Sequence, residues 1–103
     1  MIARPALARP RVSRLAATCD PAGLHVLAYA AGFTLWHYRT EAALEAVAQL
    51  GYFNAAQALL RPGDRIAVNV QRAGRFAAAR DFCVLASLRS EVRLAPLTGA
   101  VGP

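Results

Sequence analysis

Two histidines are the side chains of this chain best suited to general acid–base catalysis, because imidazole titrates near neutral pH. His25 interrupts an apolar run, and His37 stands two residues after Leu35 in an expected strand. No nucleophilic serine motif, zinc-binding HExxH, phosphate-binding loop or dinucleotide-binding glycine pattern accompanies them. We therefore interpret both histidines as structural residues.

The acidic residues and cysteines form no recognisable chemical cluster. The six acids fall singly, except that Glu41 and Glu45 are neighbours on one helix surface. Asp64 lies in Pro62-Gly63-Asp64, where we expect a turn residue that hydrogen-bonds its own backbone. Cys19 and Cys83 are far apart without a CxxC motif, which predicts reduced thiols. The sequence predicts no enzyme, no catalytic residue, no bound metal and no cofactor.

All twelve basic residues are arginine, and the formal net charge is +6. Codon usage in a GC-rich genome explains this choice; the functional alternative is selection for guanidinium contacts with phosphate or carboxylate. Four arginines lie in the first fourteen residues, which contain no acid: Arg4, Arg9, Arg11 and Arg14. The remainder of the chain is close to charge balance, so the basic character belongs mainly to the N-terminus.

We predict that residues 1–22 form an extended arm and residues 23–103 a small domain. Pro5 and Pro10 favour extended backbone, and the four arginines keep the segment hydrated. The preferred interpretation is that these arginines dock on a neighbouring protein. Nucleic-acid binding and an inert tail are the alternatives, and the first is disfavoured because no aromatic side chain is interleaved for base stacking.

The strand patterns predict a small α+β domain built on an antiparallel sheet or partial barrel, with one or two short helices. Residues 24–31 fit a strand or a short helix, whereas 33–38 are aromatic and β-branched, as strands are. Residues 65–70 alternate cleanly, and 71–74 read as a hairpin turn. Two further strands are expected at 82–88 and 92–97, while the Ala- and Arg-rich stretch 72–80 breaks the alternation.

Two helices are expected between the second and third strands. Thr40 is a suitable N-cap for a helix over 42–50, which Gly51 would end. Asn54 is a suitable N-cap for a second, shorter helix over 55–60. Four aromatic residues surround the first helix and are either core residues or an exposed interface: Trp36, Tyr38, Tyr52 and Phe53.

Length and composition indicate one domain with a small core. The chain has 103 residues, and much of its 56% apolar content is alanine, which buries little area. We therefore expect a homo-oligomer that assembles near micromolar concentration. The longest apolar run, 24–36, is too short to span a bilayer, and prolines and arginines interrupt the N-terminus where a signal peptide would need apolar residues.

Three segments carry a resemblance to a known group of proteins. They are Leu35-Trp36-His37-Tyr38-Arg39-Thr40, Gly51-Tyr52-Phe53-Asn54, and Leu59-Leu60-Arg61-Pro62-Gly63-Asp64-Arg65-Ile66. Together with the closing strand Val92 to Leu97, they resemble small structural proteins of tailed bacteriophages, prophages and phage-derived gene transfer agents. The resemblance covers about residues 33–97, and its specific part lies within 35–66.

The resemblance implies a non-enzymatic virion component, such as a head spike, a capsid decoration protein or a fibre-attachment subunit. Expected partners are capsid, fibre or spike proteins and further copies of the chain, with fivefold assembly if it sits at a capsid vertex. The expected location is the bacterial cytoplasm during assembly and then the particle surface. The alternative is a small basic nucleic-acid-binding protein, although specific binding is not expected.

Overall fold

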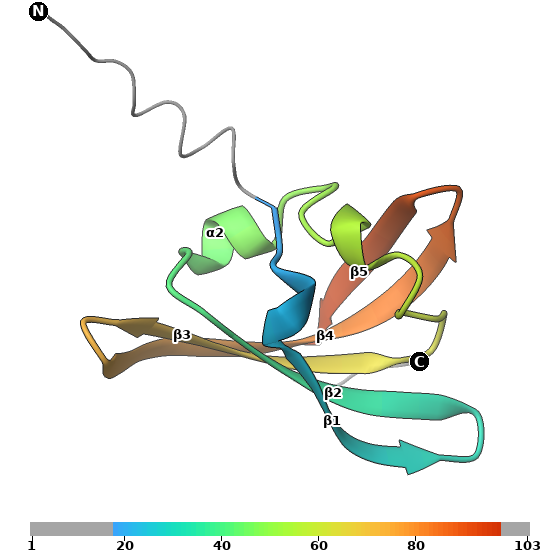
Figure 1. Cartoon of the computed structure of the whole chain (residues 1–103), viewed down its shortest axis with the longest axis horizontal. Coiled ribbons are helices and arrows are strands. Elements are labelled where there is room, and N and C mark those ends of the chain that lie inside the picture. The colour runs from blue at the N-terminus through green and yellow to red at the C-terminus, as the bar shows by residue number, and fades with distance from the viewer. Residues whose placement is uncertain (1–17, 98–103) are drawn as a thin grey trace, which may run out of the picture.

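The computed structural model describes residues 18–97, which form a five-stranded sheet with short helical turns packed on one side of it (Figure 1). The strand order follows the chain, from β1 at one edge to β5 at the other. The strands are β1 (Leu24–Ala30), β2 (Phe33–Thr40), β3 (Arg65–Arg72), β4 (Arg75–Leu88) and β5 (Glu91–Leu97). The helical elements are η2 (Pro21–Gly23), α2 (Leu44–Val47) and η3 (Asn54–Ala56).

The sheet is mixed, so the prediction of a wholly antiparallel sheet is wrong for one pair of strands. Three neighbouring pairs are antiparallel, but β2 and β3 run parallel. Parallel neighbours require a crossover, and residues 41–64 supply it by passing over one face of the sheet. The expected small domain built on a sheet is confirmed in its coarser form: residues 18–97 form one mixed sheet and one short α-helix.

The core lies between the sheet and this crossover. Ile66, Val68 and Val70 alternate on β3 as predicted, and all three are buried. Because directly opposite residues share a face of the sheet, Trp36 and Tyr38 on β2 and Phe82 on β4 extend the same apolar surface. The crossover covers this surface with five buried hydrophobic residues: Val47, Tyr52, Phe53, Ala56 and Leu60.

The two helices are much shorter than predicted. The expected helix over 42–50 has only four residues in regular α form, and the second is reduced to the 3-10 turn η3. Isolated short helices are marginal in water, so packing on the sheet decides where the backbone turns. Gly51 adopts a φ of 93°, which favours glycine, but it lies in a turn beyond α2 and does not cap it directly.

Neither predicted N-cap residue caps a helix. Thr40 instead accepts a hydrogen bond from the Ala42 N–H through its hydroxyl, while Ala43 occupies the cap position of α2 without a side-chain bond. Asn54 is the first residue of η3, and its side chain points to β5. Thr40 therefore stabilises the turn that begins the crossover, and Asn54 ties the crossover to β5.

The two ambiguous segments are strands. Residues 24–30 form β1, and the Ala- and Arg-rich stretch forms the first half of the fourteen-residue β4. The hairpin turn predicted at 71–74 is confirmed, with Ala73 and Gly74 both at positive φ. This half of β4 pairs with β3 although its sequence does not alternate and most of its side chains are exposed.

The packed part of the described chain begins before the boundary expected at residue 23. Cys19 is buried, and its N–H donates to the Tyr52 carbonyl at 2.7 Å. The four arginines assigned to the arm lie outside the described residues. Within residues 18–97, no helix has the length and apolar character needed to cross a bilayer.

Candidate functional site

Asp64 is a buried carboxylate that three N–H groups hold in place. Its Oδ1 accepts from the Thr34 backbone at 2.9 Å, and its Oδ2 accepts from Trp36 Nε1 at 3.0 Å and from the Arg61 backbone at 3.1 Å. The Arg61 contact is the local turn bond expected from the sequence, whereas the contacts with β2 were not foreseen. Since all three partners are donors that satisfy the carboxylate, Asp64 fixes the crossover turn to the sheet.

The four aromatic residues considered as an interface are buried in the core. Trp36 is 8% exposed, and Tyr38, Tyr52 and Phe53 are at most 3% exposed. Tyr38, Tyr52 and Phe53 meet edge to face, with ring centroids 5.1–6.2 Å apart. Of the two interpretations drawn from the sequence, core packing is the one that describes their position.

A small polar network closes the N-terminal side of this aromatic cluster. The hydroxyls of Tyr38 and Tyr52 lie 3.0 Å apart, and the Tyr38 hydroxyl also accepts from the Asp20 N–H at 3.1 Å. Burial raises the pKa of the Tyr52 hydroxyl well above its ordinary value. Burial, reinforced by the charge of Asp20, raises the pKa of the Cys19 thiol to about 11. Neither group is ionised at neutral pH, which fits a structural network.

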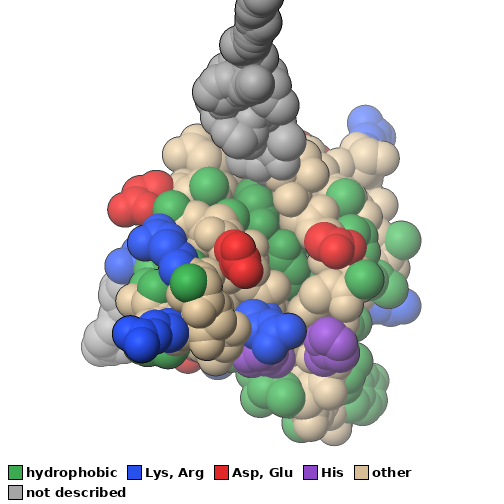
Figure 2. All heavy atoms as spheres, turned by 60° about the vertical axis from the view of Figure 1, so that its left-hand side comes forward, with side chains coloured by type: hydrophobic (Ala, Val, Ile, Leu, Met, Phe, Trp, Pro, Cys, Tyr) green, Lys and Arg blue, Asp and Glu red, His purple; other side chains and the backbone are tan. Residues whose placement is uncertain are grey.

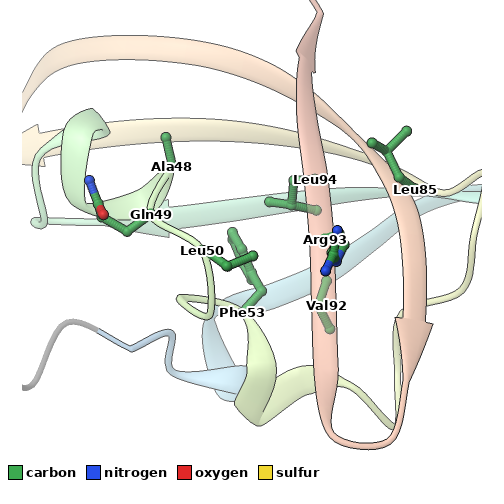
Figure 3. Close-up of a pocket in the computed structure, with 8 residues that line it drawn as sticks. All are labelled: Ala48, Gln49, Leu50, Phe53, Leu85, Val92, Arg93 and Leu94. Carbon is green, nitrogen blue, oxygen red and sulfur yellow. The ribbon is translucent and has the colours of Figure 1, made fainter.

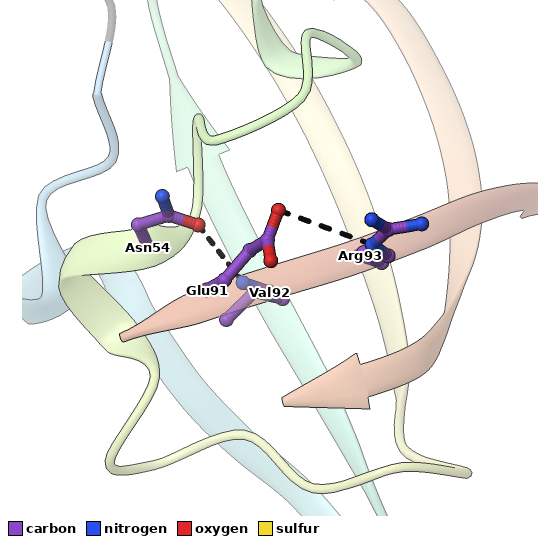
Figure 4. Close-up of polar contacts among 4 residues, drawn as sticks. All are labelled: Asn54, Glu91, Val92 and Arg93. Atoms are coloured by element: carbon purple, nitrogen blue, oxygen red, sulfur yellow. Dashed lines mark hydrogen bonds and ion pairs between the residues drawn. The ribbon is translucent and has the colours of Figure 1, made fainter. Parts of the chain in front are cut away.

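The Gly-Tyr-Phe-Asn corner is fastened to the closing strand. Asn54 Oδ1 accepts from the Val92 N–H at 2.8 Å, as the dashed line in Figure 4 shows. Beside it, Glu91 and Arg93 form an ion pair at 3.9 Å with both side chains largely exposed. Asp64 therefore joins the first and third segments that carry the resemblance, and Asn54 joins the second to the closing strand.

The two histidines lie side by side on the sheet. His25 and His37 are register partners on β1 and β2, and Arg39 borders the same shallow surface hollow together with Asp20. Figure 2 shows the histidine side chains next to one another with arginine beside them. His25 Nδ1 is 3.2 Å from the Gly23 carbonyl, a local backbone contact. No described carboxylate orients either ring as a catalytic pair would require.

An apolar groove runs between the crossover and β5, and sequence reasoning missed it. It has a volume of about 280 Å³ and is lined mainly by apolar side chains (Figure 3). Leu50 is 72% exposed and Leu85 is 58% exposed, so two large apolar side chains on its rim face solvent. Leu50, the last residue of the first predicted helix, was the one signal available in the sequence.

Strand β1 exposes three large apolar side chains within seven residues, as many as β4 exposes over fourteen. Val26, Leu27 and Tyr29 are 56%, 58% and 75% exposed. The sequence marked this segment only as an apolar run of uncertain secondary structure. Its uncharged character, now placed at the edge of a sheet, is the feature that could have indicated an interaction surface.

Among residues 18–97, no three His, Cys, Asp or Glu side chains are close enough to hold a metal ion. Comparison with protein-family models, with curated proteins and with solved structures finds no match to this chain. Large apolar side chains are exposed on β1, on β4 and beside the groove. Association with another surface would remove such side chains from water.

Proposed function

We propose that this chain is a structural subunit of a phage-like particle, most simply a head spike, decoration or fibre-attachment protein. The observation that carries the proposal is the exposed apolar surface of β1 and the groove on so small a domain. A domain of this size gains stability when such surface is covered by a neighbouring subunit.

The framework of the domain supports the same proposal. Among the residues that carry the resemblance to virion proteins, Trp36 and Asp64 bond each other, and Asn54 bonds the closing strand. These contacts hold loops and strands together, so the pattern that resembles virion proteins is one of scaffold residues. A scaffold with apolar association surfaces suits a particle component better than a catalyst.

Particle sedimentation tests this proposal directly. In the bacterium that carries the gene, an epitope-tagged chain should cosediment with the major capsid protein after particle release. A cytoplasmic marker protein serves as the control and should remain unsedimented. A chain that stays with the marker while the capsid protein sediments would contradict the proposed function.

The alternative, a small basic nucleic-acid-binding protein, has one structural observation in its favour. Arg72 and Arg75 are register partners beside the β3–β4 turn, which places two like charges opposite one another. A phosphate group would relieve this repulsion. Submicromolar DNA binding in a gel-shift titration at about 150 mM salt would support the alternative, because weak contacts with a few arginines are screened there.

A further inference from the structure

The outer side of β1 is an unpaired sheet edge. β1 is the first strand of the sheet and pairs only with β2 among the described strands. Within residues 18–97, none of the turn and loop hydrogen bonds reaches the other side of β1. A row of free N–H and C=O groups accepts another strand, because each added strand forms a ladder of backbone hydrogen bonds.

The two edges of the sheet differ in how they are protected against pairing. β5, at the far edge, contains Glu91, Arg93 and Pro96, which are residue types that discourage strand addition. β1 reads Leu-His-Val-Leu-Ala-Tyr-Ala, with neither proline nor a permanently charged side chain. Only one of the two edges is therefore open to a further strand.

A bulge places two of the three exposed apolar residues of β1, Val26 and Tyr29, on one face. Val26 lies opposite Trp36, and Tyr29 lies opposite Thr34, with Leu27 as the extra residue between the two registers. Trp36 and Thr34 are two residues apart on β2, so they share a face of the sheet. Val26 and Tyr29 therefore also share that face, although their spacing in a regular strand would put them on opposite faces.

We propose that β1 is the interface between two copies of this chain, which pair antiparallel about a twofold axis and join their sheets into one. The bulge selects the register. If the axis passes between Leu27 and Ala28, Val26 of each copy lies opposite Tyr29 of the other, and His25 lies opposite Ala30. In each of these pairs the two opposed side chains lie on the same face of the joined sheet. Val26 and Tyr29 share one face, while His25 and Ala30 share the other.

This register makes β1 complementary to itself. It forms two aromatic–β-branched pairs, which stabilise neighbouring strands, and it sets no like charges opposite each other. A head-to-tail contact would instead place the apolar β1 against the charged, proline-containing β5. We therefore infer a twofold dimer as the building block, in place of the five-membered ring expected for a vertex protein. The inference rests on the proposed function only in treating the chain as an assembly subunit.

Sedimentation of the purified full-length chain tests the dimer. We expect a monomer–dimer equilibrium with a Kd of about 10 µM, since the interface is a single short strand. Leu27→Lys should raise the Kd at least about tenfold, because the axis brings the two introduced ammonium groups together. Leu88→Lys is the matched control, since Leu88 is 66% exposed at the end of β4 and lies outside the interface. Tyr29→Lys provides a second variant at a position 75% exposed.

Cysteine pairing tests the register. A protein carrying Val26→Cys, mixed with one carrying Tyr29→Cys, should form an intermolecular disulfide between residues 26 and 29 under mild oxidation. Peptide mapping distinguishes this bond from any that involves Cys19 or Cys83. Val26→Cys mixed with Leu88→Cys should give no such product.

A monomer at 200 µM, a five-membered ring, or equal effects of Leu27→Lys and Leu88→Lys would overturn the dimer. Capture of β1 by residues 1–17 of the same chain would also overturn it and would appear as a monomer with crosslinks from Val26→Cys into that segment. These measurements use purified protein, whereas the proposed function is tested on particles. A dimer without incorporation would contradict the proposed function alone, and incorporation of a monomer would contradict the interface alone.

Discussion

At the scale of single residues, the side chains with chemical potential serve the framework. Asp64, predicted to be a turn residue that hydrogen-bonds its own backbone, is 2% exposed and also accepts hydrogen bonds from β2. A pattern such as Pro-Gly-Asp reveals the local bond, because its partner is three residues away. The partners on β2 depend on the parallel pairing, which no local pattern contains.

Replacing the Asp64 carboxylate should therefore destabilise the domain. In Asp64→Asn, one oxygen becomes an NH₂ group that faces an N–H donor, so at least one buried hydrogen bond is lost. We expect the free energy of unfolding to fall by about 1–3 kcal/mol. Urea denaturation would measure this, with the exposed Asp81→Asn as a control expected to stay within about 0.5 kcal/mol of the wild type. Equal midpoints for the two variants would contradict the structural role of Asp64.

The buried Cys19 thiol predicts a loss of stability at alkaline pH. Its pKa is raised from 9.0 to about 11 by burial, so the folded state binds more protons than the unfolded state between these values. The stabilising contribution is complete below pH 9 and is lost as the pH rises through about 11. Urea midpoints at pH 8 and pH 9.5 should differ more for the wild type than for Cys19→Ala. An equal pH effect in both proteins would exclude Cys19 as its source.

At the scale of elements, strands were easier to predict than helices. β3 is identified by Ile66, Val68 and Val70, because apolar residues at every second position are typical of a strand with one buried face. The crossover has helical composition over 42–50, yet its backbone follows the curved sheet beneath it, and α2 stops at Val47. Composition indicates that a segment can form a helix, whereas its packing on the sheet decides how many of its residues do so.

The bond between Asn54 and Val92 joins the crossover to β5 and should protect that strand. Asn54→Ala removes the acceptor, so the Val92 N–H should exchange with solvent faster, and the free energy of unfolding should fall by about 1 kcal/mol. Hydrogen exchange followed by NMR measures both effects. Gln49→Ala, an exposed change elsewhere in the crossover, should leave the Val92 exchange rate unaltered. Unchanged Val92 protection in Asn54→Ala would show that β4 alone holds β5.

At the scale of the whole molecule, the predicted arm and the association surface should contribute separately. Changing Arg4, Arg9, Arg11 and Arg14 together to serine should leave the free energy of unfolding within about 0.5 kcal/mol of the wild type, as for surface changes. If these arginines dock on a particle, the variant should lose incorporation while keeping the dimer. Particle sedimentation measures this. The charge-matched comparison changes four exposed arginines of the described domain to serine: Arg72, Arg75, Arg80 and Arg89. Undiminished incorporation of the fourfold variant would refute docking through these residues.

The candidate site was harder to predict than the fold because it consists of apolar side chains that the rest of the domain leaves exposed. The apolar run 24–31 was visible in the sequence, but nothing in it distinguished a central strand from an edge strand. Likewise, Trp36 and Tyr38 could have faced solvent, and only the placement of the crossover determines that they do not. Periodicity identifies strands, whereas the exposure of their side chains depends on where each strand lies in the sheet and on what covers it.

The single parallel pairing sets the order in which the chain can fold. β1 with β2, β3 with β4, and β4 with β5 are hairpins of neighbouring strands, which close over short loops and form early. β2 and β3 meet only after residues 41–64 have been drawn across the sheet, so this contact carries most of the entropy of loop closure. The nucleus of folding should lie there, where Trp36 first meets Asp64. Until that contact forms, the β1–β2 hairpin has both sides free, and a newly made chain is then most exposed to pairing with the wrong neighbour.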